Sequence, residues 1–287
     1  VSQERKVPGI PIEWYTQWTF TNDTPHPDPK YSDIPVSVIY VGPSTLDPGS
    51  SKRPLICWPH GGPHSTLVNA YSPLAAFFVR LGYSIVFTNF RGSLGFGQDG
   101  VDALPGYVGN TDVSDVHKGT LECIKRFNSV VDENNVFLFG GSHGGFLVTH
   151  LAAQHPNFYK AVAARNPVTD LGTMSSITDI REWTFVEAGE DFKHSSVCGP
   201  AELTKMYHMS PISLIDSVKI PVMLLIGKND RRVPPSQGIN YYKMLCARGI
   251  ETQLHLYEDC HPLSKVDVEL DVLVNSALWF DKYKAAQ

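Results

Sequence analysis

The chain has 287 residues, of which 42% are hydrophobic and 18% are charged, and its formal net charge is −5 at pH 7. This length and apolar content suffice for one large α/β domain with a filled core. A mildly acidic chain without a run of Lys and Arg argues against a nucleic-acid partner. Apolar stretches such as residues 74–79 are far too short to span a bilayer, so we expect no membrane association.

The cysteines are odd in number and widely spaced: Cys57, Cys123, Cys198, Cys246 and Cys260. Such a set predicts free thiols in a reducing compartment. Together with the lack of a visible signal peptide, this predicts a cytoplasmic protein. Because the chain begins at Val1 and not at Met, we expect a processed form or a piece of a longer protein.

Residues 1–54 are predicted to form N-terminal antiparallel strands and loops. Residues 12–20 and 34–41 have the β-branched and aromatic composition of strands. The proline-rich segments at residues 22–30 and 42–54 predict loops.

From residue 55 onward, strand patterns alternate with helix patterns. The expected strands are residues 55–58, 83–88, a run ending at Gly140, 161–164, 222–226 and 252–257. The expected helices are residues 72–81, 113–127, a segment following Ser142, 237–247 and 266–283. This alternation predicts a mainly parallel, twisted sheet with helices on both faces. It lapses over residues 169–209, which we expect to form an irregular insert near the pocket.

Residues 136–147 read VFLFGGSHGGFL, which places Gly-x-Ser-x-Gly (Gly140 to Gly144) between a strand and a helix. That context is the one in which a nucleophile elbow occurs. Glycines are needed at the flanks because a larger side chain would collide with the neighbouring elements, and the serine hydroxyl is left exposed at a strained turn. We interpret Ser142 as a catalytic nucleophile.

Two further residues complete a Ser-Asp-His set in the chain order of the α/β-hydrolases. Asp230 follows the expected strand at residues 222–226, and His261 follows the expected strand at residues 252–257. A neutral imidazole at His261 would take the proton of the serine hydroxyl and pass it to the leaving group, while Asp230 would hold the ring. Asp170, Asp179 and His255 are rivals, but none of them lies in a loop after a late strand.

The acyl transition state also needs hydrogen-bond donors for the developing oxyanion. One is expected to be the backbone N–H of His143, the residue after the nucleophile. The other is expected from the His-Gly-Gly segment after an early strand, at the N–H of Gly62. The side chains of His60 and His64 are interpreted as shaping that loop, because no third ligand for a metal is evident. We expect neither a metal nor another cofactor.

Several segments together resemble the catalytic domain of the prolyl oligopeptidase family of serine peptidases. They are WPHGGPHS (residues 58–65), NFRGSLGFGQD (89–99), GGSHGGF (140–146), ARNPV (164–168), GKNDRRVP (227–234) and the loop of His261. Within that family, the resemblance is to the acylaminoacyl-peptidase branch, and it runs from about Cys57 to the C-terminus.

This resemblance implies an α/β-hydrolase fold and a cytosolic, cofactor-free enzyme. Its implied reaction releases an N-acylated, typically N-acetylated, amino acid from the N-terminus of a short peptide. Ser142, Asp230 and His261 fall on the family's triad. Of the residues implied to bind substrate, Arg232 matches an arginine that hydrogen-bonds a substrate carbonyl, and the pocket residues are Val233, Trp183 and Phe185. We interpret Arg91 as structural.

The resemblance also implies an N-terminal β-propeller that covers the active site, and possible homo-oligomers of the full-length protein. Nothing in this chain repeats at blade spacing. We therefore expect residues 1–287 to be a single catalytic domain without the propeller, either as a fragment or as a chain that works uncovered.

Three alternative functions remain open from the residues. A general esterase or lipase of the α/β-hydrolase fold would use the same triad and oxyanion donors. A catalytically silent member of the fold could serve as a binding module, although such proteins usually lack a triad residue. A dipeptidyl peptidase would need an acidic clamp for a free N-terminus, and no such clamp is visible.

Overall fold

The computed structural model describes residues 14–195 and 197–285. Within these residues, one eight-stranded sheet has the strand order β1-β2-β4-β3-β5-β6-β7-β8. β1 and β2 at one edge pair antiparallel with each other, β2 pairs antiparallel with β4, and the remaining neighbours are parallel. The predicted α/β-hydrolase sheet is confirmed. Ile12, the start of the first predicted strand, lies outside the described residues.

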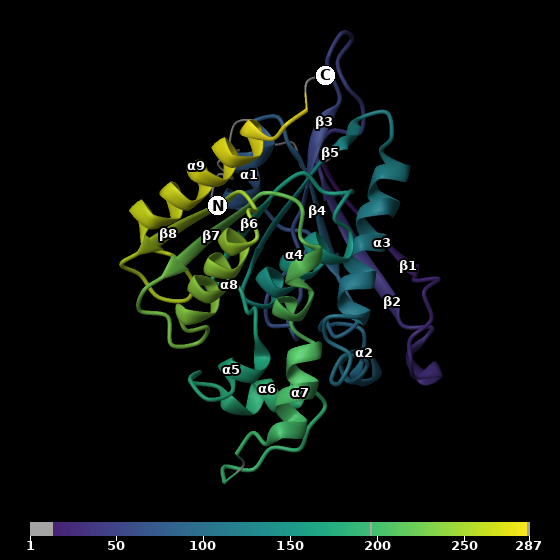
Figure 1. Ribbon diagram of the computed structural model, residues 1–287. Coiled ribbons are helices and arrows are strands. Elements are labelled where there is room, and N and C mark those ends of the chain that lie inside the picture. The colour runs from purple at the N-terminus through teal and green to yellow at the C-terminus, as the bar shows by residue number, and fades with distance from the viewer. Residues whose placement is uncertain (1–13, 196, 286–287) are drawn as a thin grey trace, which may run out of the picture.

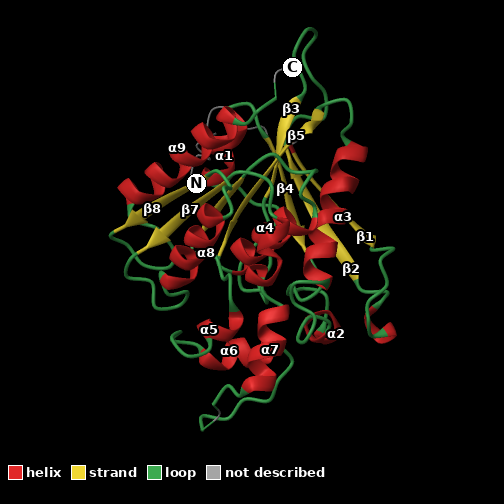
Figure 2. Ribbon diagram, in the orientation of Figure 1, coloured by secondary structure: helices red, strands yellow, loops and turns green. Residues whose placement is uncertain are grey.

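The elements alternate along the chain as predicted from residue 55 onward (Figures 1 and 2). The strands are β1 (Tyr15–Thr21), β2 (Pro35–Val41), β3 (Arg53–Cys57), β4 (Ser84–Asn89), β5 (Val131–Gly141), β6 (Val162–Arg165), β7 (Val222–Gly227) and β8 (Thr252–Tyr257). The helices are α1 (Pro73–Arg80), α2 (Gln98–Asp102), α3 (Thr111–Arg126), α4 (His143–Gln154), α5 (Leu171–Met174), α6 (Arg181–Glu187), α7 (Pro200–His208), α8 (Ser236–Ala247) and α9 (Val266–Lys282), with 3-10 turns at Pro29–Tyr31 and Pro211–Ser217.

The insert at residues 169–209 is more regular than expected. It contains the short helices α5, α6 and α7, which gather at one end of the molecule, below the strands in Figure 1. α5 and α6 have only 4 and 7 residues, so neither completes the apolar repeat by which a helix is read from sequence. α2, with 5 residues, was missed for the same reason.

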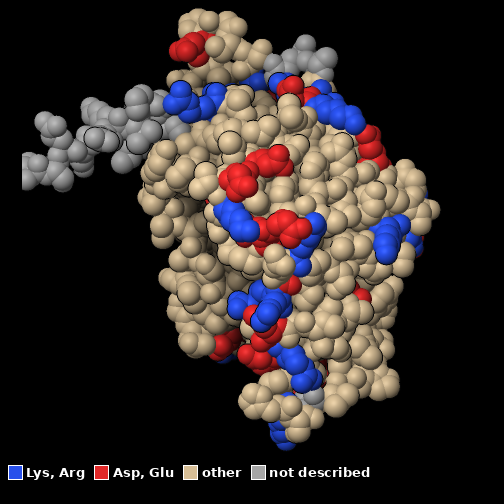
Figure 3. Space-filling view, turned by 90° about the vertical axis from the view of Figure 1, so that its left-hand side faces the viewer, with Lys and Arg blue, Asp and Glu red and all other residues tan. Residues whose placement is uncertain are grey.

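The surface carries charges of both signs. On the face shown in Figure 3, Lys and Arg lie beside Asp and Glu, so neither sign forms an unbroken field there. Among the described residues, no helix is both long and apolar enough to cross a membrane. All five cysteines are free thiols, as the sequence predicted.

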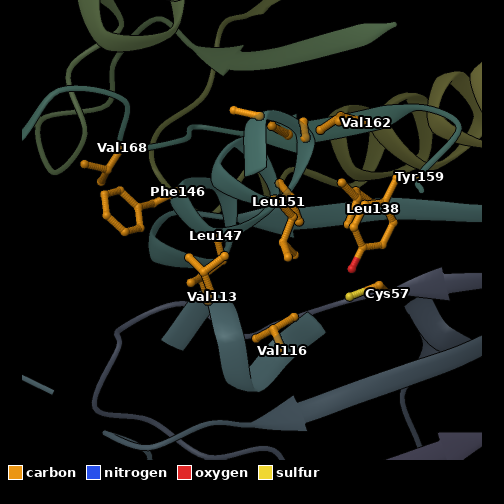
Figure 4. Packing of buried hydrophobic residues seen from close by; sticks show 14 of the residues in the cluster. Cys57, Val113, Val116, Leu138, Phe146, Leu147, Leu151, Tyr159, Val162 and Val168 are labelled. Atoms are coloured by element: carbon orange, nitrogen blue, oxygen red, sulfur yellow. The ribbon is translucent and has the colours of Figure 1, made fainter. Parts of the chain in front are cut away.

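The core lies on both faces of the sheet, because side chains alternate along each strand. On β5, Leu138 packs with α3, α4 and α8, whereas Phe137 and Phe139 pack with α1 and α9 on the other face. Figure 4 shows the first of these clusters, with Val113 and Val116 of α3 facing the side chains of α4. β5 and α4 are thus buried from both directions, which holds the turn between them in place.

Candidate active site

The turn between β5 and α4 has the strained geometry of a nucleophile elbow. Ser142 sits in the left-handed region with φ 59°, a conformation that costs a non-glycine residue about 1–3 kcal/mol. A Cβ atom on Gly140 would lie 2.4 Å from the carbonyl oxygen of Gly144, and one on Gly144 would lie 2.5 Å from that of Pro59. The requirement for glycine at both flanks is therefore confirmed as a matter of space.

Asp230 and His261 form a hydrogen-bonded pair beside this elbow. Nδ1 of His261 lies 2.6 Å from Oδ2 of Asp230, whose side chain is fully buried. Oδ1 of the same carboxylate accepts the backbone N–H groups of Arg232 and Val233 at 2.8 and 2.9 Å. The carboxylate is thus fixed by three contacts, and Nε2 is the ring nitrogen of His261 that remains for proton exchange.

The rival residues are placed elsewhere. Asp170 caps α5 by accepting the N–H of Thr173 at 3.2 Å, and Asp179 pairs with Nε of Arg232 at 2.8 Å. His255 lies within β8, where Nε2 is 3.4 Å from the side-chain amide of Gln253. None of these three hydrogen bonds involves Ser142 or His261.

Of the two expected oxyanion donors, His143 directly follows Ser142 in the chain, and Gly62 lines the same cavity as Ser142. His143 is the first residue of α4, so its N–H is one of the helix's N-terminal groups that lack an intrahelical acceptor. A Cβ atom on Gly61 would lie 3.2 Å from Cβ of Ser142. Gly61 therefore packs closely against the serine, and the next residue, Gly62, has φ +122°, where glycine is favoured.

The side chain of His143, unlike its backbone N–H, has a structural role. Its Nε2 lies 2.8 Å from Oδ2 of Asp112, and both side chains are at most 1% exposed. Oδ1 of Asp112 also accepts the N–H groups of Gly109 and Val113. The pair therefore fastens the start of α4 to the start of α3, away from solvent.

The histidines of the His-Gly-Gly loop shape that loop, as expected. His60 bonds Oγ of Ser93 at 2.8 Å and stacks on Phe90. Burial lowers the pKa of His60 to about 4, so its ring is neutral at pH 7. Nδ1 of His64 lies 2.8 Å from the carbonyl oxygen of Gly92 and Nε2 lies 3.3 Å from Oε1 of Glu187; the hydrogen bond to Glu187 raises the pKa of His64.

A cavity of about 270 Å³ joins these groups. Its lining combines apolar and polar residues, namely Gly62, Ser142, Val168, Met174, Ile180, Trp183, Arg232, Val233 and His261. The structure thus brings Ser142 and His261 to one cavity together with three of the four residues expected to bind substrate.

Phe185, the fourth, corrects the expectation. It is 2% exposed, packs in the core against Phe192, and is not among the residues that line the cavity. Trp183 and Phe185 are two positions apart on α6, and residues at that spacing face different sides of a helix. Only Trp183 faces the cavity.

Asn166 is a residue of the site that sequence reasoning missed. Its Nδ2 donates to the backbone oxygen of His261 at 2.8 Å, and its Oδ1 accepts the N–H of Gly227 at 2.7 Å. Asn166 therefore ties the histidine loop to the end of β7. Its position directly after β6, within the ARNPV segment, was the available signal, since buried amides at strand ends often join neighbouring loops.

Comparison with known proteins places this geometry in a family. A sequence profile described as the prolyl oligopeptidase family matches residues 69–286. The chain belongs to the prolyl oligopeptidase family. The family resemblance inferred from the motifs is thereby confirmed.

Similar family members are named acylamino-acid-releasing enzymes. Those of Mus musculus and Homo sapiens are each 41% identical to this chain, over 260 and 253 residues. The one from Arabidopsis thaliana is also 41% identical, over 251 residues. These alignments cover 87–88% of this chain but only 33–35% of the relatives, so the chain spans about a third of their length.

Solved structures with the same fold are more distant in sequence. The acylaminoacyl peptidase of Pyrococcus horikoshii superposes with a TM-score of 0.79 at 22% identity, over 94% of this chain and 41% of that one. A puromycin-hydrolyzing peptidase of Mycobacterium tuberculosis superposes with a TM-score of 0.82 at 20% identity, over 98% of this chain and 41% of that one. At these identities, the likeness establishes the fold.

Proposed function

We propose that this chain is the catalytic part of a serine peptidase that releases an N-acylated, typically N-acetylated, amino acid from the N-terminus of short peptides. The observation that carries this proposal is that one cavity is lined both by Ser142, at its elbow, and by His261, whose ring is hydrogen-bonded to Asp230. The names of the similar family members support the choice of substrate.

The proposed reaction begins when Nε2 of His261 takes the proton of the Ser142 hydroxyl. The oxygen then attacks the carbonyl carbon of the scissile amide, and the carbonyl oxygen becomes an oxyanion. Collapse of this intermediate breaks the carbon–nitrogen bond, and the imidazolium donates its proton to the departing amine. Water, deprotonated by the same ring, then releases the acylated amino acid and restores the serine.

The N–H groups of His143 and Gly62 are proposed to hold the oxyanion. Donors of this kind contribute roughly 3–4 kcal/mol each to transition-state stabilisation. They suit this role because backbone N–H groups at a helix start and at a glycine turn need no rearrangement as the negative charge develops.

The apolar and the polar lining residues of the cavity are proposed to recognise different parts of the substrate. Met174, Ile180, Trp183 and Val233 form an apolar wall for one amino-acid side chain. Arg232 also lines the cavity, with its side chain 47% exposed, and it would donate to a substrate carbonyl while its ion pair with Asp179 holds the guanidinium in place.

The deciding experiment compares acetyl-alanyl-p-nitroanilide with unblocked alanyl-p-nitroanilide, in the wild type and in Ser142→Ala. We expect cleavage of the acetylated substrate only, and its loss in the variant. Equal cleavage of both substrates would contradict the acyl requirement. Hydrolysis of a p-nitrophenyl ester by a folded protein that cleaves neither anilide would favour the general esterase, and failure to react with a fluorophosphonate probe would favour the silent binding module.

A covering domain is proposed as the partner of this chain in a longer protein. Exposed apolar side chains occur in two segments that lie close in sequence to cavity-lining residues: Val68 and Tyr71, 66% and 51% exposed, follow Gly62, and Ile177 and Val186, 49% and 45% exposed, lie before Ile180 and after Trp183. A β-propeller over this entrance would bury them and admit only short peptides. The free thiols support a place in the cytoplasm.

A further inference from the structure

The indole of Trp183 touches both halves of the proposed oxyanion hole. We propose that Trp183 is a positioning residue, which fixes Gly62 and His143 relative to each other in addition to lining the side-chain pocket. This inference rests on the proposed function, because it concerns the same nucleophile and the same donors.

The first contact is a hydrogen bond to the glycine loop. Nε1 of Trp183 donates to the backbone oxygen of Gly62 at 3.0 Å. Gly62 has φ +122° and no side chain, so rotation about its N–Cα bond meets little steric restraint, whereas Pro63 restricts the peptide on its carbonyl side. The carbonyl oxygen and the N–H of Gly62 lie on the two peptides that meet at its Cα, so holding the oxygen limits the displacement of this Cα and of the N–H attached next to it.

The second contact is with the residue that supplies the other donor. The rings of Trp183 and His143 meet edge to face, with centroids 6.1 Å apart and planes at 78°. The His143 ring is hydrogen-bonded to Asp112, and its centroid lies 5.0 Å from that of the Phe146 ring. Trp183, together with Phe90, thus packs against the side chain of the residue whose backbone N–H is the other proposed donor.

A third contact, one helical turn along α6, secures the indole. Glu187 is 1% exposed, and its Oε1 lies 3.3 Å from Nε2 of His64, a residue of the same loop as Gly62. Residues four apart share one face of a helix, so Trp183 and Glu187 clamp α6 onto a single loop. The buried carboxylate of Glu187, which is not part of the proposed triad, would thus help to position Trp183.

The consequence is a coupling between pocket and oxyanion hole. A substrate side chain that enters the cavity packs against the same indole whose N–H holds Gly62. Filling the pocket therefore stabilises the arrangement of the oxyanion donors. A pocket wall without this hydrogen bond would affect only substrate affinity.

Trp183→Phe separates these two roles, because it keeps an aromatic wall and removes the N–H donor. The informative substrate is p-nitrophenyl acetate, whose acetyl group leaves the side-chain pocket empty. We expect its kcat to fall roughly 5- to 10-fold with little change in KM, as the loss of one neutral hydrogen bond predicts. An unchanged kcat for this ester, with changes confined to substrates that have large side chains, would overturn the proposal.

Two companion variants make the result specific. Trp279→Phe is the matched control, since Trp279 is a buried indole on α9 at the other face of the sheet, and it should leave the ester kcat unchanged. If Trp183→Phe does not fold, Glu187→Gln loosens the clamp without touching the indole and decides the question. It should lower the same kcat, and wild-type turnover in it would contradict the proposal.

The proposed function is tested separately by labelling with a fluorophosphonate probe. Labelling of the wild type and not of Ser142→Ala supports the serine chemistry. With labelling intact, wild-type ester turnover in Trp183→Phe rejects the positioning role alone. Absence of labelling in the folded wild type rejects the proposed function and the inference with it.

Discussion

Two histidine–aspartate pairs flank Ser142, and their surroundings differ. His261 lies 2.6 Å from Asp230 with its ring 26% exposed, whereas His143 lies 2.8 Å from Asp112 with its ring 1% exposed. The hydrogen bonds are nearly the same length and the partners are the same residue types. His261 of the first pair lines the cavity, whereas both side chains of the second pair are buried.

Access decides what each pair can do. A proton is transferred only to a group within hydrogen-bond reach of the reacting atom, so the ring of His261 suits the role of base. The ring of His143 packs against Phe146 and Trp183, and its remaining nitrogen has no partner in the described part of the chain. The same two residue types are therefore suited to turnover in one pair and to architecture in the other.

The largest expected effect comes from removing the accessible histidine. His261→Ala, like Ser142→Ala, should lower kcat by about a millionfold, because these residues act as one unit. The free energy of unfolding should change little, since the ring is partly exposed. Turnover of acetyl-alanyl-p-nitroanilide and urea denaturation measure the two quantities, and retention of more than a few per cent of activity would reject His261 as the base.

The same substitution in each pair sharpens the comparison. Asp230→Asn should lower kcat roughly 10⁴-fold by releasing the tautomer of His261. Asp112→Asn should instead lower the free energy of unfolding by about 1–3 kcal/mol, because Asp112 takes part in two buried hydrogen bonds and one partly buried one. Its effect on kcat should stay below about 100-fold. If both variants lost activity equally with unchanged stability, the distinction between the pairs would fail.

A smaller effect is expected at the rim of the cavity. Arg232→Gln should lower kcat/KM for acetyl-alanyl-p-nitroanilide by roughly 10- to 100-fold, as loss of one charge-assisted hydrogen bond predicts. The loss should be smaller for p-nitrophenyl acetate, which lacks the peptide carbonyl. Asp179→Asn is the matched control, because it removes the partner of Arg232 and leaves the arginine charge in place. Equal losses on both substrates would argue against recognition of the peptide.

The smallest effect concerns His150, a buried histidine whose pKa is lowered by burial more than the nearby Asp112 raises it. Burial lowers the pKa of His150 from 6.5 to about 4. Between these values the unfolded chain binds a proton that the folded protein does not, so the free energy of unfolding decreases as the pH falls through this window.

His150→Gln should reduce this pH dependence. The expected difference between wild type and variant is roughly 1–2 kcal/mol over the interval from pH 6.5 to pH 5. Urea denaturation at the two pH values measures it. The same slope in both proteins would show that other groups carry the pH dependence.

Much of the sheet and of the site could be predicted from the sequence, because each depends on local patterns. The elbow could be predicted from Gly140 and Gly144, because the space at both positions admits no side chain. Asp230 and His261 each follow a strand that reads clearly, and parallel strands bring their carboxyl ends to one edge. Residues that directly follow a strand could therefore be placed from the sequence.

The insert was harder to predict because its helices are too short to show a period. Trp183 and Phe185 are both large aromatics on α6, and only packing determines which one faces the cavity. The contacts of Glu187 with His64 and of Asn166 with His261 join residues far apart in sequence. Such contacts depend on the tertiary arrangement, which no local pattern encodes.

The sheet order has a consequence for the lifetime of the active state. Ser142 follows β5, a central strand, whereas His261 follows β8, which is at the edge and paired on one side only. Edge elements open more readily than central ones. Transient fraying of β8 would withdraw the proposed base and leave the serine in place but unreactive, and it would be reversed when the strand pairs again. The fraction of molecules competent at any moment is then set by the local stability of this last strand and by the Asn166 amide that fastens its loop, rather than by the global stability of the fold.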